Sequence, residues 1–97
     1  MSTAGCSQSP EIPPTLPKDI YDWSEDNVAA FFMVNERVYR LKNDHIHTLK
    51  RNKIDGFILF DLKNEDLVNM GLEYGQAMKF LKLLMELKNL VEPGKQP

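Results

Sequence analysis

This chain contains very little cysteine: its 97 residues include one, Cys6. A lone cysteine excludes an internal disulfide and a metal site built on several thiolates. The chain also contains no Asn-x-Ser/Thr glycosylation acceptor. Both absences predict a reducing, intracellular compartment, either cytoplasmic or nuclear.

Long hydrophobic runs are missing as well. The longest, residues 28–34 and 57–60, fall far below the roughly 20 apolar residues that span a bilayer. Residues 1–7 lack the basic start and the apolar stretch of a secretory signal. We therefore predict a protein that is neither transmembrane nor secreted.

Prolines gather at the two ends of the chain, where residues 1–17 hold four of the six and residues 92–97 hold the other two. Neither stretch offers much that could be buried. We predict a flexible leader over residues 1–17, one folded domain over residues 18–91 and a flexible tail over residues 92–97. Hydrophobic residues make up 42% of the chain, which is enough for one modest core.

The first helix is predicted to begin after Ser24, a residue type that caps helices well. The apolar residues that follow have the i, i+3, i+4 spacing of one buried stripe: Val28, Phe31 and Phe32. Trp23 precedes the cap, where a large apolar side chain can pack onto that stripe.

Several short elements are predicted next. Residues 35–44 are polar and predict a loop with a turn of helix, whereas residues 44–52 predict a short helix. The run 57–60 suits a buried strand by periodicity, but it has no partner strand, so a short helix is favoured. A further brief helix capped by Asn64 ends before Gly71, which suits a left-handed position.

The longest helix is predicted over Gly75 to Val91. Its buried face is expected to contain Phe80, Leu81, Leu84, Leu87 and one of Leu90 or Val91. Its outer face is expected to contain Gln76, Lys79, Lys82, Glu86 and Asn89. Together these elements predict an all-α fold in which short helices pack on a long C-terminal helix.

Charge is distributed in bands, although the net charge is only −2. The band 36–53 is basic, because Glu36 and Asp44 are outweighed by Arg37, Arg40, Lys42, Lys50, Arg51 and Lys53. The band 54–73 is acidic, because Lys63 is outweighed by Asp55, Asp61, Glu65, Asp66 and Glu73. Such bands predict surface regions of opposite potential.

An ordered set of motifs extends over residues 20–91. It comprises a Trp-Ser-x-x-x-Val opening, an Ile-Asp-Gly-x-x-Leu junction, a Glu-Asp-Leu helix ending in Met-Gly-Leu, and a long helix led by Gly. The residues that form it are Trp23, Val28, Phe31, Phe32, Leu49, Ile54, Asp55, Gly56, Leu59, Leu62, Glu65, Asp66, Leu67, Met70, Gly71, Leu72, Gly75, Lys79, Phe80 and Leu81. In this order the chain resembles the sterile alpha motif (SAM) family, although residues 35–40 are additional to the usual pattern.

The resemblance implies a five-helix SAM-like bundle that mediates protein association. Many family members join head to tail, pairing an acidic mid-loop face with a more basic end-helix face at the start of the last helix. The mid-loop face would comprise Asp55, Asp61, Glu65 and Asp66. The end-helix face would comprise Tyr74, Gln76, Lys79 and Lys82. The expected partner is another SAM-like domain, on a copy of this chain or on a different protein.

The basic segment 37–53 supports an alternative function. Its six cationic side chains would attract phosphate groups of RNA or of an anionic lipid at low salt. The acidic residues fit a binding face and an ordinary solvated surface equally well.

Metal and catalytic sites find little support. The acidic band lacks the Asp-x-Asp-x-Asp-Gly loop of a calcium site. His45 and His47 are two residues apart, so their rings would point about 200° apart on a helix and could not share a zinc ion. Ser24 is explained as a cap and Cys6 lies in the leader, outside any nucleophile motif. We predict no enzymatic activity, no metal and no cofactor.

Overall fold

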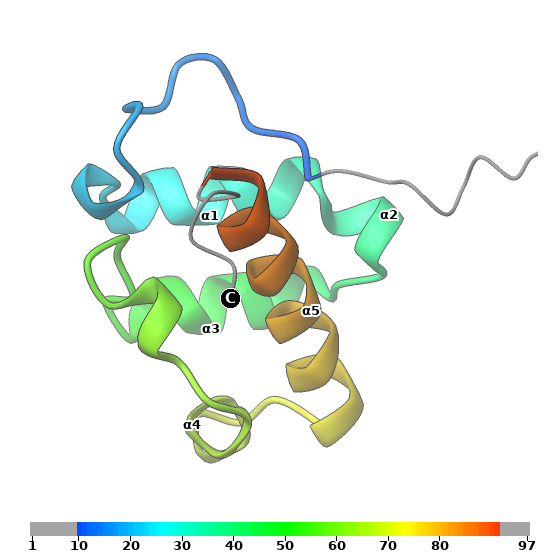
Figure 1. The fold of residues 1–97 in the computed structure, drawn as a ribbon. Helices are drawn as coiled ribbons and strands as arrows, with labels where there is room; N and C mark the ends of the chain where they lie inside the picture. The colour runs from blue at the N-terminus through cyan, green and yellow to red at the C-terminus, as the bar shows by residue number, and fades with distance from the viewer. Residues whose placement is uncertain (1–9, 92–97) are drawn as a thin grey trace, which may run out of the picture.

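Short helices surround one long helix in the computed structural model, which describes residues 10–91. The elements are η2 (Ile20–Asp22), α1 (Glu25–Val34), α2 (Glu36–Tyr39), α3 (Asn43–Arg51), η3 (Leu59–Asp61), α4 (Asn64–Asn69) and α5 (Tyr74–Val91), where η denotes a 3₁₀ turn. Within residues 10–91 there is no strand. Figure 1 shows α5 crossing in front of α1 and α3, with α2 and α4 at the edges. The predicted all-α class, with five helices and a long C-terminal one, is confirmed.

The start of α1 is closed by a reciprocal pair of hydrogen bonds. The Asn27 N–H donates to Ser24 Oγ at 3.1 Å, and the Ser24 N–H donates to Asn27 Oδ1 at 2.9 Å. These bonds satisfy backbone donors that have no partner within the helix. Glu25 and Asp26 add negative charge at the positive end of the helix dipole. The cap predicted at Ser24 is confirmed.

The core forms where α1, α3 and α5 meet. α1 packs against α3, and Phe32 of α1 meets Phe80 of α5 edge to face, with ring centroids 5.0 Å apart. Trp23 lies against Phe31, with ring centroids 5.4 Å apart. All four side chains are buried. The predicted contact of Trp23 with the apolar stripe of α1 is therefore confirmed.

The polar segment after α1 contains the predicted turn of helix, because α2 has four residues, about one helical turn. Asn35 joins the two helices and is buried. Its side-chain amide donates to the Phe31 and Glu11 carbonyl oxygens, both at 2.8 Å, and its Oδ1 accepts from the Glu11 N–H. α2 ends at Arg40, whose φ of 59° is left-handed.

Residues 10–17 lie along the bundle. Ile12 and Leu16 pack against the core, and Trp23 Nε1 donates to the Pro17 carbonyl oxygen at 2.8 Å. The domain boundary predicted at residue 18 therefore falls inside a segment that contacts the helices. The rest of the predicted leader and the predicted tail lie outside the described residues.

Gly56 lies at the junction between α3 and η3, close to η2. Its N–H donates to the Trp23 carbonyl oxygen at 2.9 Å. A Cβ at this position would lie 1.7 Å from the Ile20 carbonyl oxygen. Glycine is required here because two backbone segments approach each other too closely for a side chain.

The run 57–60 differs from the predicted short helix. Only its last residues enter a 3₁₀ turn, η3. Leu59 is buried, whereas 71% of Phe57 is exposed and Ile58 is exposed too. A 3₁₀ helix has three residues per turn, so the single turn η3 can direct few side chains of the run 57–60 into the core.

The N-cap of α4 lies one residue before the predicted cap. Lys63 is the N-cap and Asn64 is the first helical residue. The Lys63 N–H donates to Asp66 Oδ2 at 2.9 Å, so Asp66 holds the helix start. Gly71 has a φ of 113°, which confirms its predicted left-handed position.

α5 begins one residue before the predicted start, and its buried face differs from the prediction at several positions. The buried residues are Gln76, Ala77, Phe80, Leu83, Leu84 and Leu87. The prediction that Gln76 lies outside is wrong, because only 8% of it is exposed. The prediction of a buried Leu90 or Val91 is also wrong, because both are exposed.

Candidate protein-interaction faces

The four residues predicted for the mid-loop face divide into two pairs. Asp55 and Asp66 are half-buried and have local structural contacts. The Phe57 N–H donates to Asp55 Oδ1 at 3.1 Å, and Asp66 caps α4 as described above. Asp61 and Glu65 are exposed and form no ion pair within residues 10–91. These two carboxylates are the ones available to a partner.

An apolar centre accompanies these acids, and sequence reasoning missed it. Phe57 is exposed between Asp55 and Asp61 in the chain, and its ring meets the exposed ring of Tyr21 edge to face at 6.4 Å between centroids. Ile58 beside it is exposed as well. Gly56 could have indicated this exposure from the sequence, because a glycine that allows a tight backbone turn can leave the next side chain pointing outward. Exposed aromatic side chains within a charged rim are typical of binding hot spots.

Three of the four residues predicted for the end-helix face are exposed. Tyr74 is 67% exposed, and Lys79 and Lys82 are exposed on the next turns of α5. Met78, which was not predicted for this face, is also exposed. It lies one helical turn after Tyr74, so the two side chains share one side of α5.

Gln76, the fourth residue predicted for the end-helix face, is buried, and its side chain is engaged within the domain. Its Oε1 accepts from the Lys42 N–H at 2.9 Å, and its Nε2 donates to the Arg40 carbonyl oxygen at 3.0 Å. Both partners are backbone groups of the connection between α2 and α3. The side chain is thus fully occupied by holding that connection against α5.

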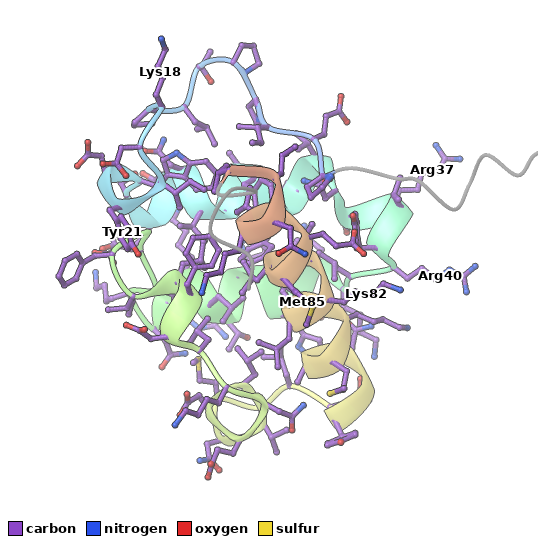
Figure 2. The ribbon with its side chains drawn as sticks, in the orientation of Figure 1. Lys18, Tyr21, Arg37, Arg40, Lys82 and Met85 are labelled. Carbon is purple, nitrogen blue, oxygen red and sulfur yellow. The ribbon has the colours of Figure 1, made fainter. Side chains whose placement is uncertain are left out.

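Three of the six cations in the basic segment 37–53 contact other side chains of the domain. Several of its residues have partners within the domain: Lys42 Nζ lies 3.0 Å from Glu73 Oε1, Lys50 Nζ lies 2.7 Å from Asp26 Oδ1, and Arg51 donates to Thr48 Oγ1 at 3.2 Å. Arg37, Arg40 and Lys53 form no ion pair within residues 10–91. Figure 2 shows Arg37 and Arg40 extending outward on the side where Lys82 also lies.

Glu73 occupies a charged contact at the start of α5. The Lys42 ammonium, through its hydrogen bond and its charge, holds the pKa of the Glu73 carboxyl below its ordinary value, and His45 contributes to a smaller extent. His45 Nε2 lies 3.7 Å from Glu73 Oε1, whereas His47 is exposed. This contact neutralises the acid nearest to Tyr74.

The surface groove between η3 and α5 offers little chemistry. It has a volume of about 290 Å³ and is lined by Leu59, Phe60, Leu62, Leu81, Leu84, Met85 and Lys88. The apolar side chains and the single lysine ammonium that line this groove provide neither a nucleophile with its base nor a pair of acid and base groups. Within residues 10–91 no group of His, Cys, Asp or Glu side chains is placed to hold a metal ion. None of the helices described here combines the length and apolar character that a bilayer crossing requires.

Comparison with known proteins identifies the family. The family model described as "SAM-like domain" matches residues 1–86, so the chain belongs to the SAM-like domain family. Domains of this family are typically non-catalytic modules for protein interaction. The predicted family and the predicted SAM-like bundle are both confirmed.

Two curated relatives are similar over part of their length. The chain is 35% identical over 74 residues to the Polycomb protein Sfmbt of Drosophila melanogaster, which covers 75% of this chain and 6% of that protein. It is 29% identical over 73 residues to human Sterile alpha motif domain-containing protein 9, covering 75% of this chain and 4% of that protein. The chain thus spans a small fraction of these relatives. No solved structure matches it.

Proposed function

We propose that this domain associates with other SAM-like domains, including copies of itself, through its mid-loop and end-helix faces. The observation that carries the proposal is the presence of two exposed aromatic residues, Phe57 and Tyr74, in surroundings of opposite charge. Asp55 and Asp61 flank Phe57, whereas Lys79 and Lys82 follow Tyr74 on α5. Apolar centres with oppositely charged rims favour both affinity and correct orientation.

The positions of the two faces favour head-to-tail assembly. Tyr21, which contacts Phe57, and Lys82 extend from opposite sides of the domain (Figure 2). A contact between two different faces leaves one of each kind unoccupied at the ends of a pair. Further copies can then add at both ends, so the proposed product is an open chain of domains.

Charge reversal on each face tests this pairing. Asp61→Lys should block the mid-loop face and Lys79→Glu should block the end-helix face, so each variant alone should sediment as a monomer. An equimolar mixture should form a dimer, because each variant retains the face that the other has lost.

Lys50→Gln provides a control, because it removes one charge where α3 meets Asp26 of α1, and neither of these helices contributes to the two faces. It should assemble as the original chain does. If Asp61→Lys and Lys79→Glu both sediment like the original chain, the assignment of these faces is wrong.

A further inference from the structure

Helix α2, formed by the segment that is additional to the family pattern, lies against α5. The Tyr39 hydroxyl donates a hydrogen bond to a carboxylate oxygen of Glu86. At the next residue of the chain, the Arg40 carbonyl oxygen accepts from Gln76 Nε2 at 3.0 Å. These two contacts attach α2 along α5 from residue 76 to residue 86.

Two lysines of the end-helix face lie on the edge of α5 that meets α2. Lys79 is three residues after Gln76, and Lys82 is four residues before Glu86. Residues three or four apart share one face of a helix, so both lysines lie beside the residues that contact α2. Figure 2 shows Lys82, Arg37 and Arg40 on the same side of the domain.

The four cations of this region are not neutralised internally. Arg37, Arg40, Lys79 and Lys82 are all exposed and form no ion pair within the described part of the chain. Glu73 pairs with Lys42, whereas Glu86 accepts from the Tyr39 hydroxyl and keeps its negative charge, so the four cations outnumber the carboxylates of Glu86 and Glu36. Glu36, at the start of α2, is half-buried. A positive potential therefore extends from α5 onto α2.

We propose that α2 extends the end-helix face, and that Arg37 and Arg40 join Lys79 and Lys82 in one extended basic face. Its partner is the acidic mid-loop face of a second copy of this chain. This inference rests on the head-to-tail pairing proposed above and adds a segment that selects acidic partners. Gln76 acts as a positioning residue, because it holds the connection that carries Arg40.

An acidic protein surface fits this region better than a polyphosphate does. Val38 lies between the two arginines in the chain and is exposed, and Met78 is exposed beside Lys79. The mid-loop face offers matching chemistry, with exposed Ile58 next to exposed Asp61. Apolar side chains among the charges favour a partner that also buries hydrocarbon.

The test measures one interface in isolation by titration calorimetry. A chain carrying Asp61→Lys, with its basic face intact, is titrated with a chain carrying Lys79→Glu, with its mid-loop face intact. Adding Arg37→Gln and Arg40→Asn to the first chain should weaken binding about fivefold to tenfold and reduce its salt dependence. Asparagine is chosen for position 40 because it tolerates the left-handed backbone there.

A matched control removes two charges elsewhere on the same chain, through Lys18→Gln and Lys88→Gln. Its affinity should stay within about twofold of the parent, because neither lysine belongs to the extended basic face and exposed charges outside a contact are largely screened by salt. An equal loss in the control and in the arginine variant would reduce the effect to net charge and overturn the proposal. An unchanged affinity of the arginine variant would overturn it as well.

The same titration separates this proposal from the broader one. If the two parent chains do not bind at all, the head-to-tail pairing fails and the extended face fails with it. If they bind but ignore the arginines, only the extended face fails.

A short RNA duplex and vesicles containing phosphatidylserine serve as competing probes. Loss of RNA or vesicle binding in the arginine variant, with pairing of the two chains unchanged, would assign this face to phosphate and contradict the proposed partner.

Gln76→Leu tests the positioning role. It should weaken binding in the parent chain, and it should have little further effect once Arg37 and Arg40 have been replaced. Equal losses in both backgrounds would contradict a role that acts through α2.

Discussion

The Tyr39 hydroxyl donates to the carboxylate of Glu86 and so connects the four-residue helix α2 to the long helix α5. A helix this short is not stable alone, because nucleation costs more than its few backbone bonds return. Its position therefore depends on side-chain contacts with its neighbours. Two of these contacts are the bond from Tyr39 to Glu86 and the bond from Gln76 to the Arg40 carbonyl oxygen. They lie at opposite ends of the region where α2 meets α5.

Tyr39→Phe should lower the free energy of unfolding by about 1–2 kcal/mol, because it leaves the partly buried Glu86 carboxylate without this donor. Urea denaturation followed by circular dichroism measures the change. Tyr21→Phe is the control, because Tyr21 is exposed, and it should be close to neutral. An equal stability of the two variants would contradict a structural role for the Tyr39 hydroxyl.

The stability of the domain should also depend on Tyr39 in alkaline solution. Burial, and then the hydrogen bond and charge of Glu86, raise the pKa of Tyr39 above its ordinary value of 10.0. The folded state thus keeps this proton where the unfolded state loses it, so the contribution is complete below pH 10.0 and declines above it. Above that pH the original chain should lose stability more steeply than Tyr39→Phe. Parallel curves would contradict the assigned shift.

Glu73 should titrate below its ordinary pKa because of its contact with Lys42. Carboxyl-resolved NMR titration measures this value directly. Lys42→Gln should raise the midpoint, and high salt should have the same effect because the pair is exposed. A midpoint that does not respond to Lys42→Gln would show that the ion pair does not persist in solution.

Gly56→Ala should destabilise the domain by about 1–3 kcal/mol or more, because the added Cβ meets backbone atoms that must move. Gly75→Ala is the matched control within α5, where a Cβ meets nothing within 4 Å. That change should stabilise the helix by about 0.5–1 kcal/mol. Thermal melts of both variants test the contrast, and similar shifts in the same direction would contradict the packing at the junction.

Substitutions of Asp66 and Asp61 should affect different properties of the domain, stability for Asp66 and binding for Asp61. Asp66→Ala removes the acceptor at the start of α4 and should cost about 0.5–2 kcal/mol of stability. Asp61→Ala should leave stability nearly unchanged and weaken binding to a second copy. If melting shows no difference between the two variants, the division of the mid-loop face into structural and available carboxylates is incorrect.

Local signals predicted much of this fold. The cap at Ser24 and the left-handed Gly71 depend on residues within one turn, so the sequence alone was sufficient to predict them. The positions of Gln76 and Phe57 were not predictable in this way. Gln76 is buried because its partners are backbone groups 34 and 36 residues earlier in the chain. Phe57 is exposed because it precedes the 3₁₀ turn η3, in a stretch where a short helix was expected.

The candidate site shows the same limit. Charge bands in the sequence correctly separated acidic from basic regions, but they could not distinguish residues with internal partners from available ones. Lys50 pairs with Asp26 on α1, which lies far from it in the sequence. Arg37 and Arg40 were assigned to an alternative nucleic-acid or lipid surface, whereas the packing of α2 on α5 puts them on the same side of the domain as Lys82 (Figure 2).

Sedimentation equilibrium of the unmodified chain over a wide concentration range is the most direct test of head-to-tail association. Head-to-tail association predicts an average mass that rises steadily with concentration, passes that of a dimer and falls back when salt is added. A mass that stays at the monomer value at every concentration would contradict self-association through these two faces.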